Sequence, residues 1–90
     1  MPHLKFTPNL KRFFPELKTM EVYAGSIPEL IDCAEIKYPG LKNYILDEQG
    51  QLRKHVQIFI GEDFIKDRKG LTDKIEENDE VYIMQALSGG

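Results

Sequence analysis

The sequence predicts an α+β fold in which a mixed sheet of four to five strands packs on one helix. Strand-like alternation occurs near both ends of the chain, and one long amphipathic segment follows the second alternating run. Further alternating runs come after that segment. Strands with one apolar face and a helix with one apolar stripe bury these surfaces against each other as two layers. We therefore expect residues 1–90 to form one domain.

The composition is that of a soluble globular protein. Of the 90 residues, 41% are hydrophobic and 30% charged, and the net charge of −3 is not that of a nucleic-acid binder. No window approaches the roughly 18 apolar residues of a membrane span. The single Cys33 excludes an internal disulfide, and the N-terminus lacks the apolar stretch of a signal peptide. We expect a cytoplasmic protein that is monomeric when free and binds neither nucleic acid nor membrane.

Two strands are predicted before the helix. The segment HLKFT alternates, with Leu4 and Phe6 on one face. Proline and asparagine then break the pattern, and residues 8–17 are expected to form an irregular connection. Alternation returns at Met20 and Val22, which indicates a second strand paired to the first.

The one long helix is predicted in SIPELIDCAEIKYPGL. Ser26 lies three residues before Glu29, the spacing of a capping box, and Pro28 falls in the first turn, where its missing N–H costs little. The apolar stripe of this helix consists of Ile27, Leu30, Ile31, Ala34 and Tyr38. The sequence YPG then ends the helix. Ile36 lies opposite the stripe, so it is either exposed or part of an irregular last turn.

The second half of the chain is predicted to supply the remaining strands. Two runs follow Leu41, separated by the turn-rich DEQG. The later run is a central strand whose inward residues are Val56, Ile58 and Ile60. Gly61 ends it, residues 64–65 form a short edge piece, and residues 71–75 form a brief helical turn. The final strand is EVYIMQA, and the fold requires it to lie beside the first strand in the middle of the sheet.

Signatures of catalysis or metal binding are missing. His3, Cys33 and His55 are scattered, without CxxC or HExxH spacing, so we expect no bound metal. Gly25 stands alone and Gly89-Gly90 ends the chain, so a glycine-rich nucleotide loop is not supported, and Ser26 is explained as a helix cap. We expect no catalytic residues and no bound cofactor. Two short basic clusters, 53–55 and 66–69, fit a solvated surface better than a dedicated site for an acidic partner.

The outer face of the sheet is a candidate docking surface. If Val81 and Ile83 face the helix, then Phe59, Tyr82 and Met84 lie on the opposite face. A sheet covered by one helical layer normally presents a polar second face to water, so this apolar patch indicates partner docking. The alternatives are scattered surface hydrophobics or cover from the long loops.

The chain ends in QALSGG. Two glycines without Cβ atoms make a thin segment that fits where side chains would clash, so Gly89 and Gly90 could deliver a carboxylate into another protein's active site. On its own this signal is weak, because an inert end accounts for two glycines equally well.

The surrounding sequence adds a resemblance. EENDEVYIMQALSGG, preceded by HVQIFIGEDFI and SIPELIDCAEIKYPGL, resembles the ubiquitin-like sulfur-carrier family of the MoaD/ThiS type. This family includes the molybdopterin synthase small subunit and the sulfur carriers of thiamine and cysteine biosynthesis. The matching features are the acidic turn at Asp79-Glu80 and the terminal Gly89-Gly90. Several relatives carry proline where this chain has Gln85, so the resemblance implies a thin tail rather than a rigid one.

The resemblance implies a β-grasp fold and a carrier rather than an enzyme. In this family an E1-like adenylating enzyme uses ATP to activate the C-terminal carboxylate, here that of Gly90, and sulfur then displaces AMP to give a thiocarboxylate. A sulfur-accepting synthase is the second partner. Gly89 forms the slender neck, and Leu87 and Ser88 belong to the tether within the tail, residues 87–90. Because Gly90 is already last, no trimming is expected.

Other functions stay open at this point. A ubiquitin-like modifier joined through Gly90 to lysines would use the same activated carboxylate. A plain interaction module would use only the apolar outer face, and an independent enzyme fits least. The extra turn in ILDEQGQLRKHVQIFI resembles the carriers for cysteine synthesis more than the shorter thiamine carriers, while molybdopterin synthesis and tRNA thiolation remain possible pathways.

Overall fold

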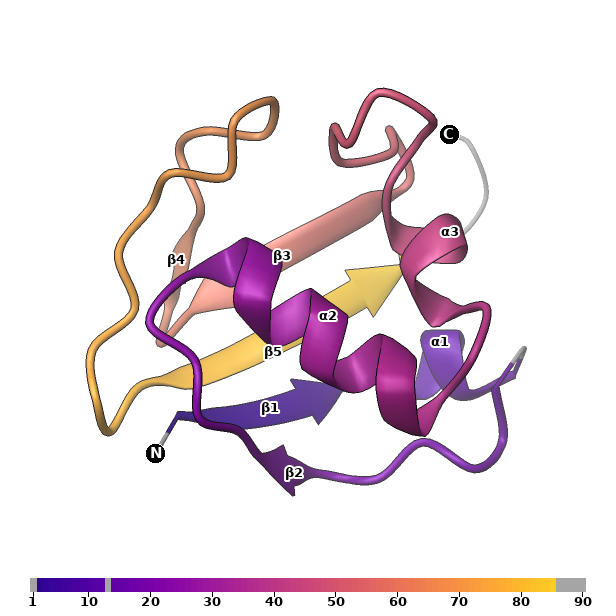
Figure 1. Ribbon diagram of the computed structural model, residues 1–90. Helices are drawn as coiled ribbons and strands as arrows, with labels where there is room; N and C mark the ends of the chain where they lie inside the picture. Colours follow the sequence, from indigo (N-terminus) through magenta and orange to yellow (C-terminus); the bar gives the residue numbers. More distant parts are fainter. Residues whose placement is uncertain (1, 13, 86–90) are drawn as a thin grey trace.

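The computed structural model describes residues 2–12 and 14–85, and its strands form one mixed sheet in the order β2-β1-β5-β3-β4 (Figure 1). The strands are β1 His3–Phe6, β2 Met20–Glu21, β3 Val56–Ile60, β4 Asp63–Phe64 and β5 Glu80–Gln85. β1 and β5 run parallel to each other, and the other pairings are antiparallel. The prediction that the first and last strands lie side by side within the sheet is therefore confirmed.

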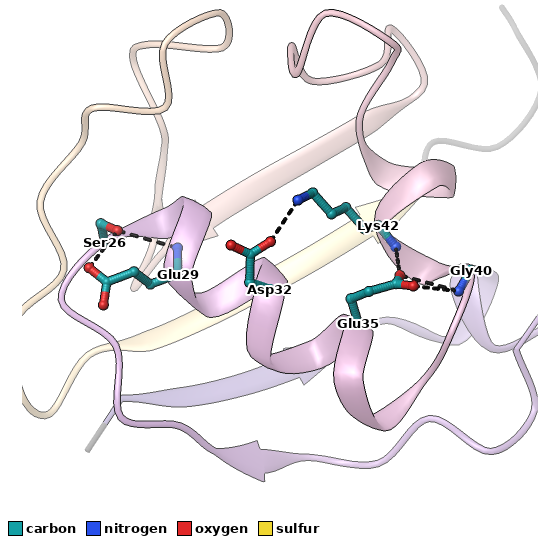
Figure 2. Close-up of polar contacts among 6 residues, drawn as sticks. All are labelled: Ser26, Glu29, Asp32, Glu35, Gly40 and Lys42. Carbon is teal, nitrogen blue, oxygen red and sulfur yellow. Dashed lines mark hydrogen bonds and ion pairs between the residues drawn. The ribbon is translucent and has the colours of Figure 1, made fainter.

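Helix α2, Ile27–Lys37, crosses one face of the sheet (Figure 1). The Ser26 hydroxyl accepts a hydrogen bond from the Glu29 N–H at 3.3 Å and donates one to the Glu29 carboxylate at 3.1 Å (Figure 2). This pair satisfies one of the free N–H groups of the first turn, as the sequence spacing predicted. Ile36 is 83% exposed, so the helix keeps its regular geometry and simply presents Ile36 to solvent.

The core lies between α2 and the sheet, and the predicted stripe of α2 is buried along its whole length. The inward sheet residues are Leu4, Phe6, Val56, Ile58, Val81 and Ile83, all buried. Full burial of one such aliphatic side chain contributes about 1.5–3 kcal/mol. Among the described residues the buried set contains no polar or charged side chain. This apolar contact fixes which face of each strand points outward.

The expectation that residues 8–17 are irregular is wrong at their start. Pro8–Lys11 form a short helix, α1. Proline suits the first helical position because its missing N–H has no partner there and its φ angle is already helical. Leu10 then points into the core and is fully buried. Burial of Leu10 favours the helical conformation of α1, and the alternation of apolar residues in the sequence did not indicate this helix.

A third helix, α3 (Leu41–Ile45), stands where the sequence predicted the first of the two strand-like runs, so that prediction is wrong. Gly40 adopts a left-handed φ of 98°, which turns the chain and lets a new helix start immediately after α2. The Glu35 carboxylate accepts hydrogen bonds from the N–H groups of Gly40 at 3.0 Å and Lys42 at 2.8 Å (Figure 2). The Lys42 ammonium lies 2.7 Å from Asp32. Side chains of α2 therefore hold the first turn of α3.

The predicted helical turn at residues 71–75 is also wrong. Lys74 forms an isolated antiparallel bridge with Ser26, and Leu71 has a positive φ of 53°. The Asp73 carboxylate accepts the N–H groups of residues 66 and 67, while Asp67 accepts those of residues 69 and 70. The left-handed backbone of Leu71 excludes a helical turn that starts there, and the two aspartate side chains instead satisfy backbone donors among residues 66–70.

Candidate functional site

The outer face of the sheet, opposite α2, carries a row of side chains in register. Lys5 of β1 pairs with Tyr82 of β5, and Tyr82 also pairs with Phe59 of β3. Phe59 in turn pairs with Phe64 of β4. The Phe59 and Phe64 rings lie 4.4 Å apart, and the Lys5 ammonium lies 5.5 Å from the Tyr82 ring centre. Cross-strand neighbours of this kind form one continuous aromatic surface with a cation at its edge.

A surface pocket of about 400 Å³ adjoins this row. It is lined by Thr7, Phe59, Gly61, Glu62, Tyr82 and Met84. The three residues that the sequence singled out for docking, Phe59, Tyr82 and Met84, therefore meet around one hollow, and each is half-buried. Phe64 beside them is 57% exposed. An apolar hollow with partly exposed rings is the kind of surface on which a partner's side chain can lose its contact with water.

One edge of the row is charged. The Glu80 carboxylate accepts hydrogen bonds from the Tyr82 hydroxyl at 2.8 Å and from the Lys5 ammonium at 3.3 Å. The Tyr82 hydroxyl, and after it Lys5, hold the pKa of Glu80 below its ordinary value. The same hydrogen bond to Glu80 raises the pKa of Lys5. Both groups are ionised at neutral pH, so the apolar row ends in an ion pair beside the Tyr82 hydroxyl.

The base of the tail lies at the far end of β5. Gln85 pairs with Val56 of β3 and is the last described residue. Its side-chain oxygen accepts a hydrogen bond from the hydroxyl of Tyr44 on α3. In Figure 1 the tip of β5 accordingly points toward α3. The predicted site residues of the tail, Leu87, Ser88, Gly89 and Gly90, lie outside the described residues.

The residues considered for metal binding remain apart. Over residues 2–12 and 14–85, no group of three or more His, Cys, Asp or Glu side chains is close enough to hold a metal ion. Cys33 is partly buried against the core. None of the described helices is long and apolar enough to cross a membrane.

The two basic clusters lie next to each other, and an arginine of each donates hydrogen bonds within the loops. The Arg68 guanidinium donates to the Gln57 side chain at 2.8 Å and to the Arg53 carbonyl at 2.7 Å. Arg53 in turn donates to the Asn43 carbonyl at 2.9 Å. These hydrogen bonds tie the loops before β3 and after β4 to each other and to α3, which supports a structural role for both arginines.

A profile of the ThiS family matches residues 9–90. The chain belongs to the ThiS family. The resemblance to ubiquitin-like sulfur carriers is thereby confirmed, and it extends over nearly the whole sequence. The sulfur carrier protein CysO of Mycobacterium tuberculosis is 25% identical over 75 residues, which cover 81% of each protein.

Solved structures confirm the β-grasp fold. A chain in the crystal structure of the Amycolatopsis orientalis BexX/CysO complex superposes with a TM-score of 0.83 at 20% identity, covering 100% of both chains. The Mycobacterium tuberculosis CysO structure gives 0.80 at 20% identity, covering 97% of this chain and 100% of that one. Small archaeal modifier protein 1 from Methanosarcina acetivorans gives 0.78 at 22% identity, covering 99% and 95%.

Two residues near the site were missed from the sequence. Phe64 was expected only in an edge strand, yet the two-residue turn at Gly61-Glu62 aligns it with Phe59 on the outer face. The signal was present, because glycine at the first position of a two-residue turn is typical of a β-hairpin, and Gly61 has a φ of 64°. Tyr44 had no comparable signal, since its position depends on the unpredicted α3.

Proposed function

We propose that this protein is a sulfur carrier whose Gly90 carboxylate is activated by a partner enzyme. The observation that carries the proposal is the ThiS-family match over residues 9–90, which includes the Gly89-Gly90 end. The likeness to CysO carriers supports the same role. In this role the protein is a co-substrate, and the partner supplies the catalytic groups.

The proposed chemistry has two steps, adenylation of the carboxylate and displacement of AMP by sulfur. A Gly90 carboxylate oxygen attacks the α-phosphorus of ATP, and pyrophosphate leaves, giving an acyl-adenylate. A hydrosulfide ion then attacks the acyl carbon. AMP and the hydrosulfide proton leave, giving a thiocarboxylate. The first step is needed because a free carboxylate has no good leaving group. The thiocarboxylate is a strong nucleophile that stays attached to its carrier until an accepting synthase uses it.

The outer-face row is proposed as the docking surface for the adenylating enzyme. Phe59, Tyr82 and Met84 line one pocket, and Met84 directly precedes Gln85, the last residue of β5 and two positions before the tail. A partner bound over this pocket would lie beside the start of the tail and could receive Gly90 in its active site. The Amycolatopsis CysO in a complex with BexX supports binding of a separate protein by such a carrier.

The likeness to CysO also supports cysteine biosynthesis as the destination of the sulfur, with cofactor synthesis as the other branch. Presenting the thiocarboxylate form to candidate acceptor enzymes, one pathway at a time, tests this choice. The expected result is sulfur transfer to the cysteine-forming enzyme, and transfer only to a cofactor synthase would contradict it.

The carrier chemistry itself is tested by incubating the protein with its adenylating enzyme, ATP and a sulfur source. Intact mass should rise by the difference between one sulfur and one oxygen atom, and a variant lacking Gly90 should not change. An unchanged mass with an active enzyme would contradict the proposal.

A second candidate is a protein modifier, favoured by the likeness in fold to small archaeal modifier protein 1. The same acyl-adenylate would then react with a lysine amine to form an isopeptide bond. Digestion of cell extracts with chymotrypsin, which cleaves after leucine and so after Leu87, should in that case yield lysines carrying a Ser-Gly-Gly remnant from this chain. The absence of such modified lysines would contradict the modifier role and leave the carrier role as the only candidate.

A further inference from the structure

We propose that Tyr44 is a positioning residue that sets the direction in which the chain leaves β5. The inference rests on the proposed function, in which Gly90 must reach a partner's active site. Its basis is the hydrogen bond from the Tyr44 hydroxyl to the Gln85 side chain, which joins α3 to the last described residue of the sheet.

The helix that carries Tyr44 is firmly anchored. Leu41 and Ile45 lie one turn apart on α3 and are both fully buried. Across the first turn, the Glu35 carboxylate accepts two backbone N–H groups and the Lys42 ammonium contacts Asp32 (Figure 2). A helix of five residues has little stability of its own, so these contacts from α2 and the core keep α3 in place.

The Tyr44 ring is held as well. Its centre lies 5.5 Å from the Phe14 ring and 5.8 Å from the His55 ring, with interplanar angles of 75° and 81°. Edge-to-face pairs of this geometry contribute beyond simple burial and restrict ring rotation. The hydroxyl is therefore presented in one direction, toward β5.

Gln85 receives this contact on the helix side of the sheet. It lies two residues after Ile83, whose side chain points into the core, so its side chain is on the same face. The neighbouring Met84 lines the pocket on the opposite face. Tyr44 thus contacts the end of β5 on the helix side of the sheet, so a partner bound to the outer face would not displace this contact.

The distance from Gln85 to the reacting carboxylate of Gly90 amplifies small changes in direction at Gln85. Gly90 is five residues beyond Gln85, and five extended residues span at most about 18 Å. When a partner's active site holds these five residues extended, a rotation of about 10° at Gln85 moves their far end by roughly 3 Å. Misplacement of a reacting atom by even about 1 Å can lower a rate about 100-fold.

The kinetic experiment uses Tyr44→Phe, which removes the hydroxyl and keeps the ring contacts. Tyr38→Phe is the matched control, because the Tyr38 hydroxyl also makes a hydrogen bond, here as acceptor from the Lys18 N–H at 3.2 Å. The Tyr38 ring also has an edge-to-face aromatic neighbour. With the adenylating enzyme, Tyr44→Phe should lower kcat about tenfold and leave KM for the carrier within about twofold. The control should leave both unchanged. Equal kcat in wild type and Tyr44→Phe would overturn the inference.

A second measurement needs no partner. Backbone amide exchange in Ile83–Gln85 should become about tenfold faster in Tyr44→Phe and stay unchanged in Tyr38→Phe. Gln85→Leu should produce the same acceleration, and combining it with Tyr44→Phe should add nothing further. If wild type is not adenylated, the proposed function is contradicted. The amide-exchange measurement then tests by itself whether Tyr44 positions the end of β5. Unchanged exchange in Tyr44→Phe would then overturn the positioning role.

Discussion

Replacing Phe59 by alanine tests whether the outer face of the sheet binds the adenylating enzyme. In the free protein the ring is half-buried and packs on Phe64 at a centroid distance of 4.4 Å. Loss of that aromatic pair removes about 0.5–1.5 kcal/mol, and the lost burial of the ring adds to it, so Phe59→Ala should destabilise the fold by at least this much. If the ring is an anchor in the complex, its truncation should weaken docking by about 2 kcal/mol, or roughly 30-fold.

The assay is pyrophosphate release at varied carrier concentration, with unfolding by urea measured in parallel. Ile58→Val is the matched control, because Ile58 adjoins Phe59 on β3, points into the core and is fully buried. Its loss of one methylene should also destabilise by about 0.5–1.5 kcal/mol. Phe59→Ala should raise KM about 30-fold while Ile58→Val leaves it unchanged. Equal KM values for the two variants would refute the docking assignment.

Three further predictions concern the helices that support the site (Figure 2). Ser26→Ala should lower the free energy of unfolding by about 0.5–2 kcal/mol in urea titration, because it removes the cap of α2. Gly40→Ala should lower it by about 1–2 kcal/mol in the same assay, since φ is 98° while an added Cβ meets nothing within 4 Å. Backbone hydrogen bonds from Gly40 and Lys42 hold the pKa of Glu35 below its ordinary 4.5, so its stabilisation is present above that pH and fades below it. Glu35→Gln should therefore flatten the loss of stability on acidification below pH 4.5, measured by denaturation at stepped pH.

The sheet and the main helix were predictable because their patterns report burial directly. Ile58 and Ile83 alternate with outward residues along strands, and the stripe of α2 repeats at helical spacing. Once two layers were assigned, the outward positions of Phe59 and Tyr82 followed from the period of two. The family resemblance supplied the role proposed for the tail, which periodicity cannot supply.

The short helices were not predictable in the same way. α1 and α3 span four and five residues, too few for a helical period to appear. Their stability comes from tertiary contacts, such as Leu10 in the core and Glu35 at the first turn of α3. The hydrogen bond between Tyr44 and Gln85 joins residues 41 positions apart, and only the folded chain reveals it.

The central claim is that Gly90 carries sulfur as a thiocarboxylate, and intact mass spectrometry tests it most directly. Wild type, a variant lacking Gly90 and a variant with one alanine added after Gly90 are each incubated with the adenylating enzyme, ATP and a sulfur source. We expect exchange of one oxygen for one sulfur in wild type, reversed by hydrolysis, and no change in either variant. A wild-type mass that stays constant while the enzyme converts a known carrier, or equal conversion of the extended variant, would contradict it.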